Sequence, residues 1–366
     1  MGRIAGAALM AIGLAALSGQ AAQAQPRAAK LSAGEAVAAE AVVNGQIFSA
    51  GDDPYPPHGT TFAGGVTGLP DMTYQILPGF RPMVLDLYLP PASFKGPRPV
   101  IVFTHGGGWI GGGKRLSGAF DNFPRVLASI ARRGYVVAAV AYRFSGEAPS
   151  PAAIQDVKAA IRWLRANSAK YRIDRERFGI FGGSAGGQLA GLAAASCGVA
   201  ALSPPSAAVR RNATVEDPRA GTASPEAQSD CVQAGVAWYG IFDFATMPQS
   251  DVMNAYMGCR NAPCTDEQKR MPSAQSYLGP KTPPILVITG ANDQTVPPSQ
   301  TTNFYAAMQG KGIRSEMLVI PGVDHSFIGK TAAETQRASK TALARTIDFL
   351  DREIGDRPGQ GKPPRR

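Results

Sequence analysis

Apolar and polar positions follow two different periods along the chain. Residues 83–89 alternate apolar and polar side chains up to a Pro-Pro pair, which is typical of a strand with one buried face. Later apolar runs have the length of buried strands and lie at residues 100–103, 136–140, 178–181, 232–238, 285–288 and 317–320. The segments between them predict helices, clearest in residues 152–169 and also expected at residues 184–195, 300–309 and 333–350.

This alternation predicts how the chain is organised. Continuous apolar strands that alternate with helices favour a mostly parallel sheet with helices on both faces. We therefore expect one α/β catalytic domain over residues 70–354, with its chemistry at the carboxyl ends of the strands. Residues 25–69 are rich in Gly and Pro and predict irregular structure. Residues 198–230 interrupt the alternation with several prolines and predict an insertion, which is either a lid near the substrate or a surface loop with no role.

The first 24 residues have the pattern of a signal peptide. Arg3 precedes an apolar run over residues 4–17, and Ala22-Gln23-Ala24 forms a small-residue cleavage pattern. The alternative is a membrane anchor, but the run is shorter than the roughly 20 residues that a span requires. We expect cleavage after Ala24, a periplasmic or secreted protein, and no stable membrane association afterwards.

The net charge of the chain adds little to these expectations. The formal net charge is +10, but part of it lies in the Pro/Gly-rich tail of residues 355–366, which predicts a disordered, solvated end. There is no basic helix with interleaved aromatic side chains, so we expect no nucleic-acid partner.

Export gives the four cysteines an oxidising compartment. Cys259 and Cys264 enclose a short loop, and Cys197 and Cys231 bracket the insertion. We expect these two pairs to form disulfides. Free thiols or a zinc site are the alternatives, although the histidines of a mixed zinc site are not nearby. We expect no metal and no cofactor.

A candidate nucleophile lies between the strand at 178–181 and the helix at 184–195. Gly182-Gly183-Ser184-Ala185-Gly186 matches the G-x-S-x-G elbow, in which glycines make room for a tight turn from strand to helix. The alternative is a Gly-rich turn that only starts a helix. The flanking strand and helix favour Ser184 as a nucleophile.

A serine nucleophile requires a base and an orienting acid. The chain has three histidines, and only His325 follows Ser184, as the order Ser, acid, His requires. Asp293 and Asp243 are the candidate acids at strand ends. Asp293 directly follows the strand at 285–288 and is preferred, whereas Asp243 has an alternative role as a helix cap or turn residue. Asp324 adjoins His325, and neighbouring side chains in an extended loop usually point apart.

The glycine loop that begins at His105 supplies a candidate oxyanion hole. His105-Gly-Gly-Gly-Trp109 follows the strand at 100–103, and glycines let backbone N–H groups face a developing negative charge. We expect donors at Gly107, Gly108 and Ala185, with His105 organising the loop. A phosphate-binding loop is the rival interpretation, but no Gly-Lys-Ser/Thr pattern is present.

These motifs carry a resemblance to a known family. Together with Tyr142-Arg143, residues 155–167 and Tyr171-Arg-Ile-Asp, they make about residues 85–350 similar to bacterial esterases and lipases, above all to the feruloyl-esterase-like group related to hormone-sensitive-lipase-like esterases. The resemblance implies an α/β-hydrolase fold with a mostly parallel eight-stranded sheet, and it implies ester hydrolysis by Ser184, Asp293 and His325. One departure is Gly183, where hormone-sensitive-lipase-like enzymes usually carry Asp.

The function expected from the sequence is therefore hydrolysis of small acyl or aromatic-acid esters through an acyl-enzyme, with a small-molecule ester as the partner. An exopeptidase or amidase of the same fold is one alternative, since the same triad serves both bonds. A non-catalytic binding protein is another. Trp109, Tyr142 and Trp238 are expected to line the substrate pocket, although each is also a candidate core residue.

Overall fold

The computed structural model describes residues 59–204 and 227–356. The predicted signal peptide lies outside the described residues, as do residues 205–226 of the insertion and residues 357–366 of the tail. Among the helices of the described ranges, none has the length and apolar character needed to cross a membrane.

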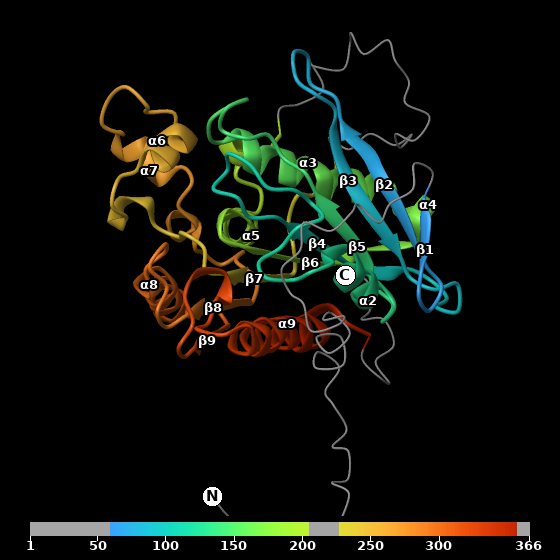
Figure 1. Cartoon of the computed structure of the whole chain (residues 1–366). Helices are drawn as coiled ribbons and strands as arrows, with labels where there is room; N and C mark the ends of the chain where they lie inside the picture. Colours follow the sequence, from blue (N-terminus) through green and yellow to red (C-terminus); the bar gives the residue numbers. More distant parts are fainter. Residues whose placement is uncertain (1–58, 205–226, 357–366) are drawn as a thin grey trace, which may run out of the picture. The chain divides into compact units, whose positions relative to one another are not determined.

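The core of the fold is a nine-stranded sheet in the order β1-β2-β3-β5-β4-β6-β7-β8-β9 (Figure 1). From β5 to β9 all neighbours are parallel, whereas β1, β2 and β3 pair antiparallel with their neighbours. The mostly parallel sheet is thus confirmed, with nine strands instead of eight. The strands are β1 (Thr60–Phe62), β2 (Val66–Gln75), β3 (Met83–Leu89), β4 (Arg98–Thr104), β5 (Val136–Val140), β6 (Ile173–Gly183), β7 (Ala234–Trp238), β8 (Ile285–Gly290) and β9 (Ser315–Ile320).

Two of these strands correct the expectation of irregular structure up to residue 69. β1 lies wholly in that segment and β2 begins in it. β2 contains Pro70, and its register against β3 shifts between Leu69 and Met72. Because a bulge accommodates a residue that cannot donate to the ladder, the Pro and Gly residues that hid these strands in the sequence do not prevent pairing.

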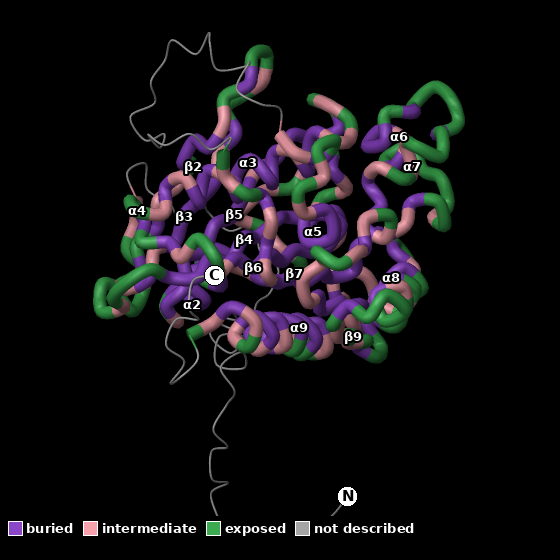
Figure 2. The backbone as a smooth tube through the Cα atoms, turned by 180° about the vertical axis from the view of Figure 1, so that it is seen from behind, coloured by how far each residue is buried: buried purple, intermediate pink, exposed green. Residues whose placement is uncertain are grey.

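Helices cover both faces of the sheet. Side chains of α2 and α9 belong to the core on one face, and those of α3, α5 and α8 belong to the core on the other. The central strands β4, β5, β7 and β8 are buried along their whole length, as the purple tube shows (Figure 2). The helices are α2 (Phe123–Ala131), α3 (Ala152–Ala166), α4 (Ser168–Tyr171), α5 (Ala185–Ala195), α6 (Asp251–Met257), α7 (Asp266–Arg270), α8 (Pro298–Gly310) and α9 (Ala332–Ile354).

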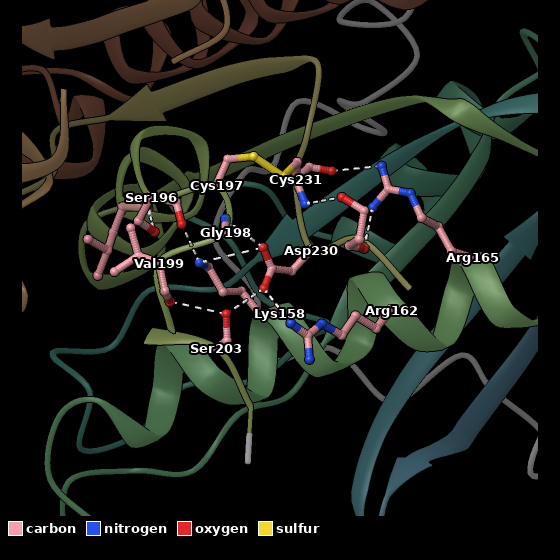
Figure 3. Close-up of polar contacts among 12 residues, drawn as sticks. Lys158, Arg162, Arg165, Ser196, Cys197, Gly198, Val199, Ser203, Asp230 and Cys231 are labelled. Carbon is pink, nitrogen blue, oxygen red and sulfur yellow. Dashed lines mark hydrogen bonds and ion pairs between the residues drawn. A yellow bond between two sulfur atoms is a disulfide. The ribbon is translucent and has the colours of Figure 1, made fainter. Parts of the chain in front are cut away.

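The two ends of the insertion are fastened to α3 (Figure 3). Cys197 and Cys231 are bonded to each other, and Asp230 accepts hydrogen bonds from the Gly198 N–H at 3.2 Å and from the Ser203 hydroxyl at 2.7 Å. From α3, Lys158 Nζ lies 3.7 Å from the Asp230 carboxylate and Arg162 lies 2.9 Å from it. The insertion therefore leaves and re-enters the domain at one cross-linked, charged point.

The second cysteine pair closes the turn after α6. Cys259 and Cys264 are bonded to each other, and the backbone N–H of Cys259 donates to the Asn254 carbonyl of α6 at 2.9 Å. Both predicted pairings are present in the structure, and they tie down segments outside the sheet.

Candidate active site

The turn that carries Ser184 joins β6 to α5 and has an uncommon backbone conformation. Ser184 has φ 57° and ψ −123°, outside the regions that non-glycine residues usually occupy. A Cβ at Gly182 or Gly186 would overlap the Thr104 carbonyl oxygen at the end of β4. Thr104 Oγ1 also donates to the Gly186 carbonyl at 2.8 Å. The glycines are therefore required by close packing against β4, and the serine side chain is left at the carboxyl edge of the sheet.

Ser184, His325 and Asp293 meet at this edge. His325 Nε2 lies 2.9 Å from Ser184 Oγ, and His325 Nδ1 lies 2.9 Å from Asp293 Oδ2. The other carboxylate oxygen of Asp293 accepts from the N–H groups of Thr295 and Val296 at 3.0 and 2.8 Å. The Asp293 side chain is buried, whereas His325 keeps 17% exposure. The structure thus brings together the three side chains expected from chain order, arranged so that a proton can pass from the hydroxyl to the imidazole.

The other candidate carboxylates serve the backbone. Asp243 caps the short 3₁₀ helix Phe244–Thr246 and accepts from the Ala245 N–H at 3.0 Å. Asp324 accepts from the N–H groups of Gln294 and His325. Neither contacts the imidazole through a hydrogen bond described in the structure, so Asp243 has the capping role that was its alternative.

The glycine loop after β4 lies against the elbow. A Cβ at Gly106 would come within 3.4 Å of Ser184 Cβ. Gly107 and Gly108 have φ of 121° and 59°, a conformation that glycine tolerates at no steric cost. Their N–H groups donate to no backbone carbonyl in the part of the chain that the structure describes. Ala185 is the first residue of α5, so its N–H has no acceptor inside the helix. The three predicted donors therefore have no backbone acceptor among the hydrogen bonds of the described residues.

His105 holds the loop in shape and does not reach the reacting atoms. Its ring stacks on Tyr142 with centroids 4.3 Å apart, and burial lowers its pKa to about 4. Since the Gly106 carbonyl 2.7 Å away can only accept, the neutral ring donates through Nδ1. This bond fixes the peptide group that joins Gly106 to Gly107 and that carries the Gly107 N–H.

The three aromatic residues expected to line the pocket lie in the core instead. Tyr142 is fully buried and donates to the His105 carbonyl. Trp238 packs on the α9 side, where its indole donates to Thr346. Trp109 stacks on Tyr256 with centroids 4.2 Å apart. Each side chain is buried, which agrees with the alternative interpretation of these three as core residues. Fully buried strands do not reveal from the sequence which side chain faces the site.

Two aliphatic residues that the sequence did not single out lie at the glycine loop instead. Ile110 and Val252 are exposed, and a Cβ at Gly108 would lie 3.8 Å from Ile110 and 3.3 Å from Val252. No group of three or more His, Cys, Asp or Glu residues in the described ranges is placed to hold a metal ion. Two exposed aliphatic side chains therefore lie beside Gly108, one of the candidate oxyanion donors.

Comparison with known proteins places the chain among esterases. The model of the family BD-FAE matches residues 85–308. Esterase LipQ of Mycobacterium tuberculosis is 30% identical over 292 residues, which cover 78% of this chain and 63% of LipQ. The probable carboxylic ester hydrolase LipM of the same organism is 30% identical over 288 residues, covering 75% of this chain and 60% of LipM. The chain thus spans less than two thirds of the length of these curated relatives.

Solved structures show the same fold. A truncated carbohydrate esterase from gut microbiota superposes with a TM-score of 0.63 at 25% identity, over 83% of this chain and 100% of that protein. The α/β-hydrolase fold implied by the sequence resemblance is confirmed, and so is its placement among esterases.

Proposed function

Because the chain belongs to the BD-FAE family, we propose that it is a serine carboxylesterase that works through an acyl-enzyme on Ser184. One observation carries the proposal: the continuous relay from Asp293 through His325 to Ser184, with 2.9 Å at both hydrogen bonds. The same relay, together with the glycine loop, supports catalysis over a binding role, because fold alone has no need for all these groups together.

The mechanism follows from this geometry. Ser184 Oγ attacks the ester carbonyl carbon while His325 Nε2 accepts the hydroxyl proton, and Asp293 orients the imidazole and stabilises its charged form. The N–H groups of Gly107, Gly108 and Ala185 donate hydrogen bonds to the oxyanion of the tetrahedral intermediate. The C–O bond then breaks, His325 returns the proton to the leaving alcohol, and an acyl-Ser184 ester remains. Water repeats the sequence, which releases the acid and restores the serine.

The substrate class in this proposal is small acyl or aromatic-acid esters. Exposed Ile110 and Val252 beside Gly108 offer an aliphatic wall to an acyl or aromatic group, and the gut-microbiota neighbour is named a carbohydrate esterase. A panel of acetyl, butyryl, long-chain, feruloyl and terephthalate-type esters tests this part. Turnover of short and aromatic esters supports it, and a preference for long chains contradicts it.

Export is the remaining part of the proposal. Two disulfides are expected in an oxidising compartment, and this supports cleavage after Ala24 and a periplasmic or secreted location. N-terminal sequencing of the protein made from its full-length gene in a bacterium tests it: a mature chain beginning at Gln25 supports it, and retention of residues 1–24 contradicts it.

The central experiment is hydrolysis of p-nitrophenyl acetate by the parent protein and by Ser184→Ala. Removing the nucleophile should lower kcat by at least about 10⁴-fold. A Ser184→Ala protein that hydrolyses the ester at the parental rate contradicts the proposed function.

A further inference from the structure

Tyr239 directly follows β7 and has an unusual backbone conformation. Its φ is 37°, a value that few residues with a side chain adopt. The residue is 2% exposed, and its N–H donates to the Ile288 carbonyl of β8 at 2.7 Å. The preceding carbonyl, of Trp238, accepts from the Ser184 N–H at 3.0 Å. The peptide between Trp238 and Tyr239 therefore connects the serine turn to the sheet.

The Tyr239 side chain extends from this peptide to the loop that carries the base. Its ring lies edge-on to His325, with centroids 4.8 Å apart at 64°, and to Phe327, with centroids 4.7 Å apart at 76°. The Ser326 side chain lies near its hydroxyl. Ser326 and Phe327 also have positive φ, 59° and 60°. Such a backbone persists only where its surroundings hold it, and here one tyrosine contacts all three residues of the loop.

The position before the nucleophile makes room for this ring. A Cβ at Gly183 would lie 2.7 Å from the Tyr239 hydroxyl oxygen and 2.9 Å from Cζ. The φ of Gly183 is outside the left-handed region, so an alanine there is allowed by the backbone and obstructed by the ring. Hormone-sensitive-lipase-like enzymes usually carry Asp at this position. In this chain the Tyr239 ring fills the space that such a side chain would need.

We propose that Tyr239 is a positioning residue that sets the place of His325 relative to Ser184, and that Gly183 is glycine because this ring packs on it. Tyr239 acts through its contacts with His325, Ser326 and Phe327 and takes no part in proton transfer. The inference rests on the proposed esterase function.

The first test compares Tyr239→Leu with Tyr239→Phe in p-nitrophenyl acetate hydrolysis. The leucine removes the ring edge from the imidazole, and a small displacement of a catalytic group costs about 100-fold in kcat. KM should change by no more than about twofold, because no substrate contact is removed. Phenylalanine keeps the ring and loses only the hydroxyl group, so kcat should fall by only about fivefold. The matched control is Phe349→Leu, another buried aromatic residue on the α9 side of the sheet, which should lower the melting temperature and leave kcat unchanged.

The second test is a double-mutant cycle between Gly183 and Tyr239, which remains informative if the leucine variant does not fold. Gly183→Ala should lower kcat by about 30-fold, because the added methyl displaces the ring. In the Tyr239→Phe background the nearest atom is absent, so the same alanine should cost less, as expected for residues in contact. Equal losses in both backgrounds, or parental kcat in Tyr239→Leu, overturn the proposal. If either of these results is found while Ser184→Ala abolishes hydrolysis in the same assay, only the proposed role of Tyr239 is contradicted. The proposed esterase function is then still supported.

Discussion

Replacement of Asp230 should destabilise the fold. Lys158 is fully buried, and its Nζ lies 3.7 Å from the Asp230 carboxylate, which is 1% exposed (Figure 3). Burial lowers the pKa of Lys158 to about 8. Burial opposes ionisation of Asp230 too, but Lys158, the Ser203 hydroxyl, the Gly198 N–H and Arg162 together lower its pKa. Both groups are therefore charged at neutral pH and stabilise each other.

Asp230→Asn removes the negative charge and leaves the ammonium group buried. Removal of one partner of a buried ion pair costs about 3–5 kcal/mol. Lys158 still donates to the Ser196 carbonyl at 2.5 Å, and asparagine keeps one acceptor, so the lower end of that range, about 3 kcal/mol, is expected. For a domain of this size the loss corresponds to roughly 5 °C in melting temperature.

Thermal unfolding followed by circular dichroism at pH 7, with the disulfides intact, measures this loss. Glu267→Gln is the matched control, because it removes a carboxylate from an exposed ion pair with Arg270 and should not change the melting temperature. Adding Lys158→Met to Asp230→Asn should restore part of the stability, since the unpaired charge is gone. A melting temperature of Asp230→Asn within about 2 °C of the parent would refute the reasoning.

Three further predictions concern the active site and pH. Asp293→Asn should lower kcat by about 10⁴-fold in p-nitrophenyl acetate hydrolysis, because the imidazole loses its orienting carboxylate; a loss under tenfold would argue for another acid. Gly107→Ala should lower kcat by about 10²–10³-fold, because its Cβ would overlap the Gly111 carbonyl; parental kcat would exclude this loop as the oxyanion site. The native-state pKa of Asp230 lies below its ordinary 3.8, so its stabilisation is present above pH 3.8 and is lost as pH falls through the native value. Melting temperatures from about pH 6 to pH 2 should therefore fall more steeply for the parent than for Asp230→Asn, and parallel curves would contradict this.

Chain order and strand ends were sufficient to predict the residues that meet at the candidate site. Ser184, Asp293 and His325 each follow a predicted strand, and parallel strands place their carboxyl ends on one edge. In the structure the three side chains lie within hydrogen-bonding distance of one another in the order Asp293, His325, Ser184. Because the chain has only three histidines and only His325 follows Ser184, the order Ser, acid, His was enough to identify the base.

The sequence could not reveal side-chain direction inside buried strands. β7 is buried at every position, so its pattern has no polar face from which to orient Trp238 and Tyr239. Trp238 packs against α9, and Tyr239 reaches the imidazole. The Tyr239 ring is a packing contact of the base in the structure. The close approach between this ring and Gly183, which marks its packing role, is visible only in the three-dimensional structure.

The strands β1 and β2 at the glycine-rich start of the domain could not be predicted from the sequence, for a related reason. β2 has an alternating pattern that Pro70 and a bulge interrupt, and its pairing with β1 and β3 decides its conformation. The position of α6, which brings Val252 to Gly108, likewise depends on tertiary packing, since this helix has only seven residues.

Covalent labelling of Ser184 tests the central claim most directly. A fluorophosphonate reacts with an activated serine hydroxyl and with few others, because only a nucleophile paired with a base attacks it rapidly. Mass spectrometry of the labelled, trypsin-digested parent should place a single adduct on the peptide that contains Ser184, with complete loss of esterase activity, and His325→Ala should label far more slowly. An unlabelled Ser184 in an active enzyme, or an adduct on a different serine, would contradict the proposed mechanism.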